Sequence, residues 1–166
     1  MKKLLYLSII LSNITYAIQL KVFSTTTHLQ IGTLELQDSE WGLLIYPNIA
    51  TLTPGVHGFH VHSNPTCDDE ITHDKTILAG LAGGHFDPQH TKLHLGPYKR
   101  AGHLGDLPVL IVSANSKATT PILAPRLKLE MLKNRSLIIH ESSDNYADQP
   151  IKLGGGGNRI ACSIIK

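Results

Sequence analysis

The chain has 166 residues, of which 42% are apolar and 17% charged, and this size favours one globular domain over a machine of several domains. Fifteen basic and thirteen acidic residues give a formal charge of +2, and the charges balance once the two lysines at positions 2 and 3 are set aside. Without a block of lysine and arginine, the sequence lacks the positive surface that non-specific nucleic-acid or membrane binding needs. Ten histidines, beside only two cysteines, point instead to imidazole chemistry.

The first seventeen residues have the form of a cleaved secretory signal. Two lysines precede an apolar run from Leu4 to Leu11, and small residues stand at positions 15 and 17, which a signal peptidase inspects. An uncleaved anchor is the alternative, but it needs about 20 apolar residues, and polar residues interrupt this run. We expect cleavage after Ala17, which would leave residues 18–166 as a single mature domain with no attachment to the membrane.

The only two cysteines, Cys67 and Cys162, are predicted to form a disulfide. An exported protein folds outside the reducing cytosol, where two cysteines in one small domain usually pair. The bond would close a loop of 95 residues, for which the chain-entropy model gives about 4 to 5 kcal/mol. Two buried free thiols are the alternative.

Short alternating or β-branched segments, separated by turn residues, predict an all-β fold. In chain order they are residues 19–23, 30–36, 43–49, 56–61, 109–114, 119–123, 136–140 and 159–165. Residues 127–132 fit either a strand or a short helix. About eight strands without a sustained helical period indicate an eight-stranded Greek-key β-barrel or sandwich.

Residues 68–107 interrupt this pattern with a long loop in which we expect no strand, because glycines and prolines break every periodicity there. Such a loop inside a compact domain needs a function or a tether, since ordering each backbone residue costs about 1 to 2 kcal/mol. Histidines and an aspartate within the loop are the candidates for that tether.

His60 and His62 lie two residues apart in an extended segment, so both side chains leave the same face of a strand. Two imidazoles are thus delivered side by side, as a metal site requires. His57 lies three residues before His60, so an extended chain turns its side chain to the opposite face. We assign it to the packing of the fold.

Within the long loop, His85, His94 and His103 recur every nine residues, and Asp106 follows three residues later. Three imidazoles and a carboxylate form a four-coordinate set that suits zinc. A metal bound there would cross-link the loop and so hold it in one conformation. His140 ends a predicted strand and could turn another imidazole into the same space. The chemistry of the residues alone leaves zinc, copper, iron and nickel open.

Five motifs stand between residues 53 and 166. They are GVHGFHVH at 55–62, GGHFDP at 83–88, HLGP at 94–97, GHLGDLP at 102–108 and GGGGNRIAC at 154–162. Together they resemble the copper/zinc superoxide dismutases, in the form that bacteria export. Before residue 53 only the strand pattern agrees with that family.

The resemblance implies one copper and one zinc ion per subunit, superoxide as the substrate, and a place in the periplasm. It makes four residues copper ligands: His60, His62, His85 and His140. It makes four residues zinc ligands: His85, His94, His103 and Asp106. His85 would then bridge the two metals and, once released by reduced copper, deliver a proton to the product.

Two further residues match positions of that family outside the ligand set. Asp144 matches a carboxylate that links a copper histidine to a zinc histidine. Arg159 matches an arginine that guides the anionic substrate to copper, which agrees with the attraction of a guanidinium for a small monoanion. Cys67 and Cys162 match the disulfide.

Some features receive no role. His73 and His90 match nothing in the pattern, and Lys75 or Lys99 could steer the substrate, although each fits a solvated surface charge better. The sequence does not decide between a monomer and a homodimer.

Two other functions are compatible with the histidines. A carrier of copper or zinc would need the ligands but not Arg159. A zinc hydrolase would need an open zinc position and a general base, which a closed set of three histidines and an aspartate does not offer.

Overall fold

The computed structural model describes residues 16–166, so residues 1–15 of the predicted secretory signal lie outside the described part of the chain. Its strands are β1 (Ala17–Ser24), β2 (Gln30–Ser39), β3 (Gly42–Ala50), β4 (Gly55–His57), β5 (Phe59–His62), β6 (Glu70–Ile71), β7 (Thr76–Ile77), β8 (Leu110–Val112), β9 (Lys117–Ala118), β10 (Ile122–Ala124), β11 (Arg135–His140) and β12 (Arg159–Ile165). Three short 3-10 helices complete this part: η1 (Gly80–Ala82), η2 (Leu129–Leu132) and η3 (Lys152–Gly155).

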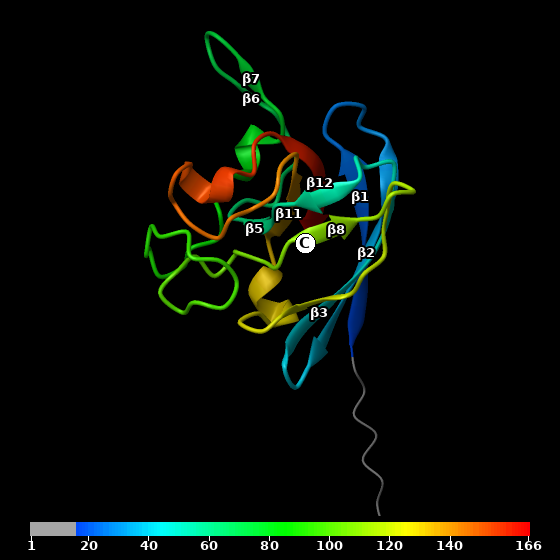
Figure 1. The fold of residues 1–166 in the computed structure, drawn as a ribbon, viewed down its shortest axis with the longest axis vertical. Helices are drawn as coiled ribbons and strands as arrows, with labels where there is room; N and C mark the ends of the chain where they lie inside the picture. The colour runs from blue at the N-terminus through cyan, green and yellow to red at the C-terminus, as the bar shows by residue number, and fades with distance from the viewer. Residues whose placement is uncertain (1–15) are drawn as a thin grey trace, which may run out of the picture.

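Most strands join one curled antiparallel sheet in the order β10, β3, β2, β1, β12, β11, β5, with β9 beside β3 (Figure 1). Strands β4 and β8 form a separate pair, as do β6 and β7. This architecture confirms the all-β class predicted from the strand pattern. Within residues 16–166, no helix is long and apolar enough to cross a membrane.

The core lies inside the curl of the sheet, and alternation along the long strands builds it. Leu34 and Leu36 in β2 and Leu43 and Ile45 in β3 are at most 1% exposed. Burying each of these side chains contributes about 1.5–3 kcal/mol to stability. The strands therefore form a rigid frame that supports the loops.

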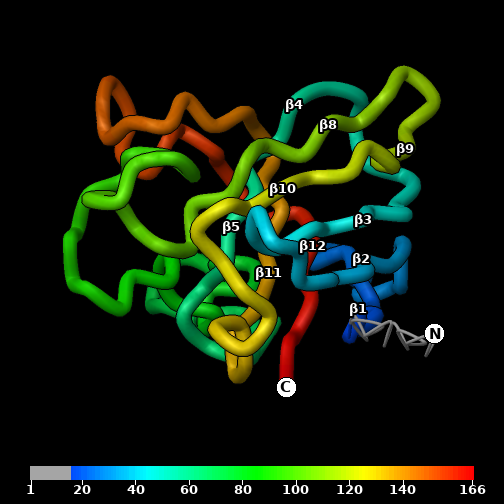
Figure 2. The backbone as a smooth tube through the Cα atoms, turned by 90° about the horizontal axis from the view of Figure 1, so that it is seen from below, coloured from blue at the N-terminus to red at the C-terminus, as the bar shows by residue number. Residues whose placement is uncertain are grey.

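Two long loops lie side by side at one side of this frame, and we call them the metal loop and the closing loop (Figures 1 and 2). The metal loop, residues 63–109, joins β5 to β8 and is drawn mainly in green. The closing loop, residues 141–158, joins β11 to β12 and is drawn in orange.

The predicted strand 56–61 is two strands, because the chain changes partners at Gly58. Before Gly58, β4 pairs with β8, and after it, β5 pairs with β11. The Gly58 N–H donates to the Ser142 carbonyl, and the Gly58 carbonyl accepts from the His140 N–H, both at 2.8 Å. A Cβ at this position would lie 3.3 Å from the His60 ring, so glycine leaves room for that ring.

The metal loop is less irregular than its sequence indicates. It contains η1 and the β6–β7 hairpin, which projects from the top of the molecule in Figure 1. The expectation of no strand there was wrong, because strands of two residues are too short to show a period. Residues 127–132, which fitted either element, contain η2.

Cys67 and Cys162 form the predicted disulfide. Cys162 lies in β12, where Ile138 of β11 packs with it, and two alanines of the metal loop, Ala79 and Ala82, complete this small buried cluster. The bond therefore ties the metal loop to the sheet. It also fits a compartment more oxidising than the cytosol.

Replacing both Cys67 and Cys162 by serine is expected to lower the free energy of unfolding by about 2–4 kcal/mol, because the cross-link restricts the unfolded chain. Urea unfolding of the metal-free proteins measures this without a contribution from bound ions. A change below about 0.5 kcal/mol, the range of ordinary surface substitutions, would contradict it.

Candidate metal centre

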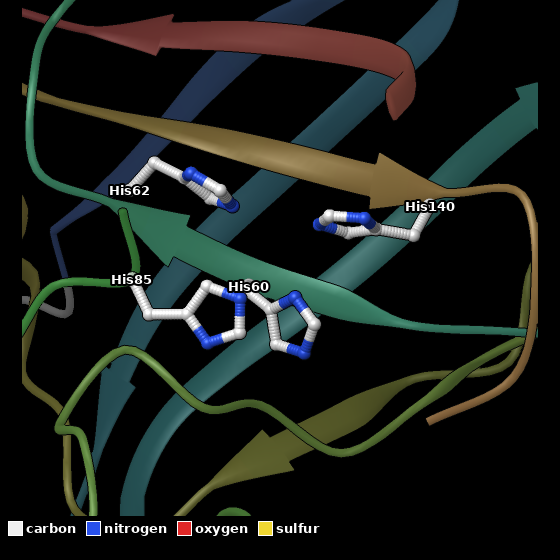
Figure 3. A group of neighbouring side chains, drawn as sticks. All are labelled: His60, His62, His85 and His140. Carbon is white, nitrogen blue, oxygen red and sulfur yellow. The ribbon is translucent and has the colours of Figure 1, made fainter. Parts of the chain in front are cut away.

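Seven side chains with metal-binding groups meet where β5 and β11 face the two loops, and none is more than 7% exposed. They fall into two groups, in each of which the ligand atoms lie within 4.8 Å of one another. The first group is His60, His62, His85 and His140, drawn in Figure 3. The second group is His85, His94, His103 and Asp106. His85 belongs to both.

Backbone bonds to β5 fix the metal loop beside the strand that carries His60 and His62. The Phe86 N–H donates to the Val61 carbonyl at 2.8 Å, and the Val61 N–H donates to the Gly105 carbonyl at 2.9 Å. A Cβ at Gly105 would overlap the Val61 carbonyl, so only glycine lets the two backbones approach this closely. The second group is thereby brought against the first.

In the first group, three histidines each place one ring nitrogen within hydrogen-bond distance of an oxygen of the protein. His60 Nε2 lies 2.6 Å from Asp144 Oδ2, His62 Nδ1 lies 2.8 Å from the Gly83 carbonyl, and His140 Nδ1 lies 3.3 Å from the Gly157 carbonyl.

The other nitrogens of these rings, His60 Nδ1, His62 Nε2 and His140 Nε2, are buried without a hydrogen-bond partner. Because a buried polar atom without a partner costs about 1–3 kcal/mol, convergent lone pairs of this kind fit a metal ion. Imidazole is a ligand that copper accepts.

The second group surrounds one carboxylate oxygen. Asp106 Oδ1 lies 3.0 Å from His85 Nδ1, 3.1 Å from His94 Nδ1 and 3.4 Å from His103 Nδ1. Three imidazole nitrogens and one carboxylate are a tetrahedral donor set that fits zinc. Since Nδ1 of His85 faces Asp106, its Nε2 remains for the first group.

Asp144 joins the two groups through its two oxygens. Its Oδ2 bonds to His60 of the first group, and its Oδ1 lies 2.8 Å from His94 Nε2 of the second. The Tyr146 N–H also donates to Oδ1, at 2.7 Å. A Cβ at Gly154, where φ is +74°, would overlap this carboxylate, so the closing loop needs glycine here.

Burial keeps the first group neutral. It lowers the pKa of His60 and His62 well below the usual value and that of His140 to about 4, and repulsion between neighbouring imidazoles, chiefly from His85, acts in the same direction. Neutral imidazole is the form that binds metals.

The carboxylates reverse this effect at His94. Burial alone would lower its pKa, but the bonds to Asp106 and Asp144 raise it to about 9. Burial would raise the pKa of both carboxyl groups, yet their bonds to the histidines lower it. These bonds therefore favour the protonated form of His94 in the metal-free protein.

Arg159 stands at the opening of the first group. It lines a cavity of about 200 Å³ together with His62, His85 and His140. Its guanidinium donates to the carbonyls of Ala79, Gly80 and Gly83 in the metal loop. The arginine is thus fixed by backbone groups that carry no charge of their own.

Lys152 also lines this cavity, and the sequence did not single it out. It lies in η3, where the following residue, Leu153, has a φ of +55°, and no local pattern announces this turn. Lys75, in the turn between β6 and β7, does not line the cavity, nor does Lys99.

Four other histidines lie outside both groups. His57 is buried, with its ring nitrogens 2.7 Å and 2.8 Å from the carbonyls of His140 and Thr53, so it serves the fold as expected. His28, His73 and His90 are exposed.

An antiparallel β fold that brings two buried ligand groups together through one shared histidine defines a protein with a dinuclear metal centre. The family model described as copper/zinc superoxide dismutase (SODC) matches residues 30–165. The chain belongs to this family, whose members use copper and zinc.

Relatives agree over most of the chain. A superoxide dismutase [Cu-Zn] of Photobacterium leiognathi is 47% identical over 146 residues, which are 88% of this chain and 84% of that protein. The Cu/Zn superoxide dismutase structure from Brucella abortus has a TM-score of 0.87 at 42% identity and covers 91% of this chain and 100% of that one. The monomeric enzyme from Salmonella enterica has a TM-score of 0.80 at 44% identity, with the same coverage. These matches confirm the predicted Greek-key barrel.

Replacing Asp144 by asparagine is expected to weaken metal binding at both groups by about 10–100-fold, because each loses a charged acceptor for a ligand histidine. Competition with chelators for zinc and for copper measures the two affinities separately. Glu141→Gln is the control, since this exposed carboxylate of the same loop bonds only to Asn158 among the described residues. Equal affinities in Asp144→Asn and the control would contradict the expectation.

Zinc binding to the metal-free protein near neutral pH is expected to release about one proton, because His94 must become neutral to act as a ligand. The apparent affinity should therefore rise with pH and level off above the pKa of His94, about 9. Titration calorimetry in buffers of different ionisation enthalpy counts the protons. Zinc binding that is independent of pH between neutrality and this pKa would refute the expectation.

Proposed function

We propose that this protein removes superoxide outside the cytoplasm, converting two superoxide ions and two protons into dioxygen and hydrogen peroxide. The observation that carries this function is the sharing of His85 by the two ligand groups, within a chain of the copper/zinc superoxide dismutase family. A shared imidazole links a redox site to a structural site through one residue.

We assign copper to the first group, His60, His62, His85 and His140, and zinc to the second, His85, His94, His103 and Asp106. Support for copper comes from a set made only of imidazoles, with three orphaned nitrogens. Support for zinc comes from the four donors around Asp106. When bound, copper supplies a reversible one-electron couple and zinc a fixed positive charge.

His85 has the role of proton carrier in this proposal. The contact of its Nδ1 with Asp106 fixes the orientation of the ring, and burial lowers its pKa. We place at its Nε2 the proton that is handed to the peroxide product.

Arg159 binds and orients the substrate anion in the cavity beside His62, His85 and His140. Its bonds to three carbonyls hold the guanidinium still without neutralising it. A fixed positive charge in a narrow opening raises the local concentration of a small anion.

The periplasm is the proposed compartment, with residues 1–17 as a cleaved signal and residues 18–166 as one mature domain. Support comes from the pattern of the first seventeen residues and from the disulfide, which persists in oxidising compartments.

Replacing Arg159 by alanine is expected to lower the second-order rate of superoxide removal by about tenfold or more at low ionic strength, with both metals retained. Pulse radiolysis measures the rate, and elemental analysis confirms the metal content. Lys99→Ala is the matched control, because this exposed cation does not line the cavity. A rate equal to that of the control would contradict the role of Arg159. A wild-type chain that holds both metals without catalysis would instead indicate a metal carrier.

A further inference from the structure

Arg126 lies outside both ligand groups, yet it contacts the backbone that carries them. It follows β10 and precedes η2 in the chain. Its guanidinium donates to four carbonyls of the metal loop: Pro97 at 2.8 Å, Gly102 at 3.2 Å, Gly96 at 3.3 Å and His103 at 2.5 Å. One side chain therefore binds both ends of the segment 96–103.

This segment separates two ligands of the second group. His94 lies two residues before Gly96, and His103 is itself one of the four acceptors. The planar guanidinium presents its donors in a rigid fork, so it fixes the spacing of the carbonyls that it binds. An ammonium group at the end of a lysine, a point charge with rotatable donors, cannot hold four carbonyls in the same way.

Gly96 extends the connection to the third ligand. Its carbonyl accepts from Arg126, while its N–H donates to Asp106 Oδ2 at 3.2 Å. Arg126 thus acts on His103 directly and on Asp106 through one peptide. Among residues 16–166, Arg126 forms no salt bridge, so its bonds serve the loop backbone.

We propose that Arg126 is a positioning residue that sets the zinc affinity of the second group, by holding residues 96–103 in the conformation that brings His94, His103 and Asp106 together. The proposal rests on the assignment of zinc to this group. It extends the metal site to a side chain that touches no ligand atom.

The test compares Arg126→Lys, which keeps the charge but loses the fork, and Arg126→Gln, which loses both, with the wild type. Zinc affinity of the metal-free chains is measured by competition with a chromophoric chelator, after circular dichroism has shown a native fold. We expect zinc binding about 10–100-fold weaker in both variants, the usual effect of losing a partner that orients ligands. Arg100→Gln is the control, because this arginine is exposed in the same segment, and its affinity should stay within about twofold of the wild type.

A second readout separates positioning from general stability. The rise in melting temperature on zinc addition reports the affinity of the folded state for zinc. We expect this rise to shrink in Arg126→Lys, and the absorption spectrum of cobalt(II) bound in place of zinc to change. Equal zinc affinity, an unchanged rise and an unchanged cobalt spectrum would overturn the proposal, even if both variants melted earlier. If the wild type bound no zinc at this group, the zinc assignment would be wrong, and the proposal for Arg126 would fail with it.

Discussion

Buried imidazoles impose the constraint that organises this molecule. A ring in the interior must satisfy two nitrogens, so His60, His62 and His140 each give one nitrogen to a protein acceptor and turn the other inward. The strands can place these three rings, because strands are rigid. The remaining ligands come from the metal loop, which has little regular structure and is held by the edge of β5, the disulfide and the carbonyl bonds of Arg159.

The fold was predictable wherever one strand has a long alternating pattern. β1, β2, β3 and β12 are seven to ten residues long and lie where the pattern places them. The break at Gly58 was not predictable, because the alternation continues through it and only the bonds to Ser142 and His140 reveal the change of partner. The β6–β7 hairpin was missed for a related reason, since its strands of two residues carry no period.

The site was predictable as far as its residues carry a chemical signature. The regular spacing of His85, His94 and His103 indicates a metal, and the structure brings these rings together. Copper as the second metal came only from the resemblance, because imidazole alone suits several ions. Lys152 and Arg126 escaped prediction, since one owes its place to an unusual turn and the other binds only backbone carbonyls far away in the chain.

Asp144 has a consequence for how the binding of one metal affects the binding of the other. Its oxygens bond to one histidine of each group, so binding at either group fixes the carboxylate in the orientation that the other requires. Occupancy of one position should therefore promote occupancy of the other, and thermodynamic linkage makes this help reciprocal by the same factor. The stronger this coupling, the smaller the share of chains that hold only one metal.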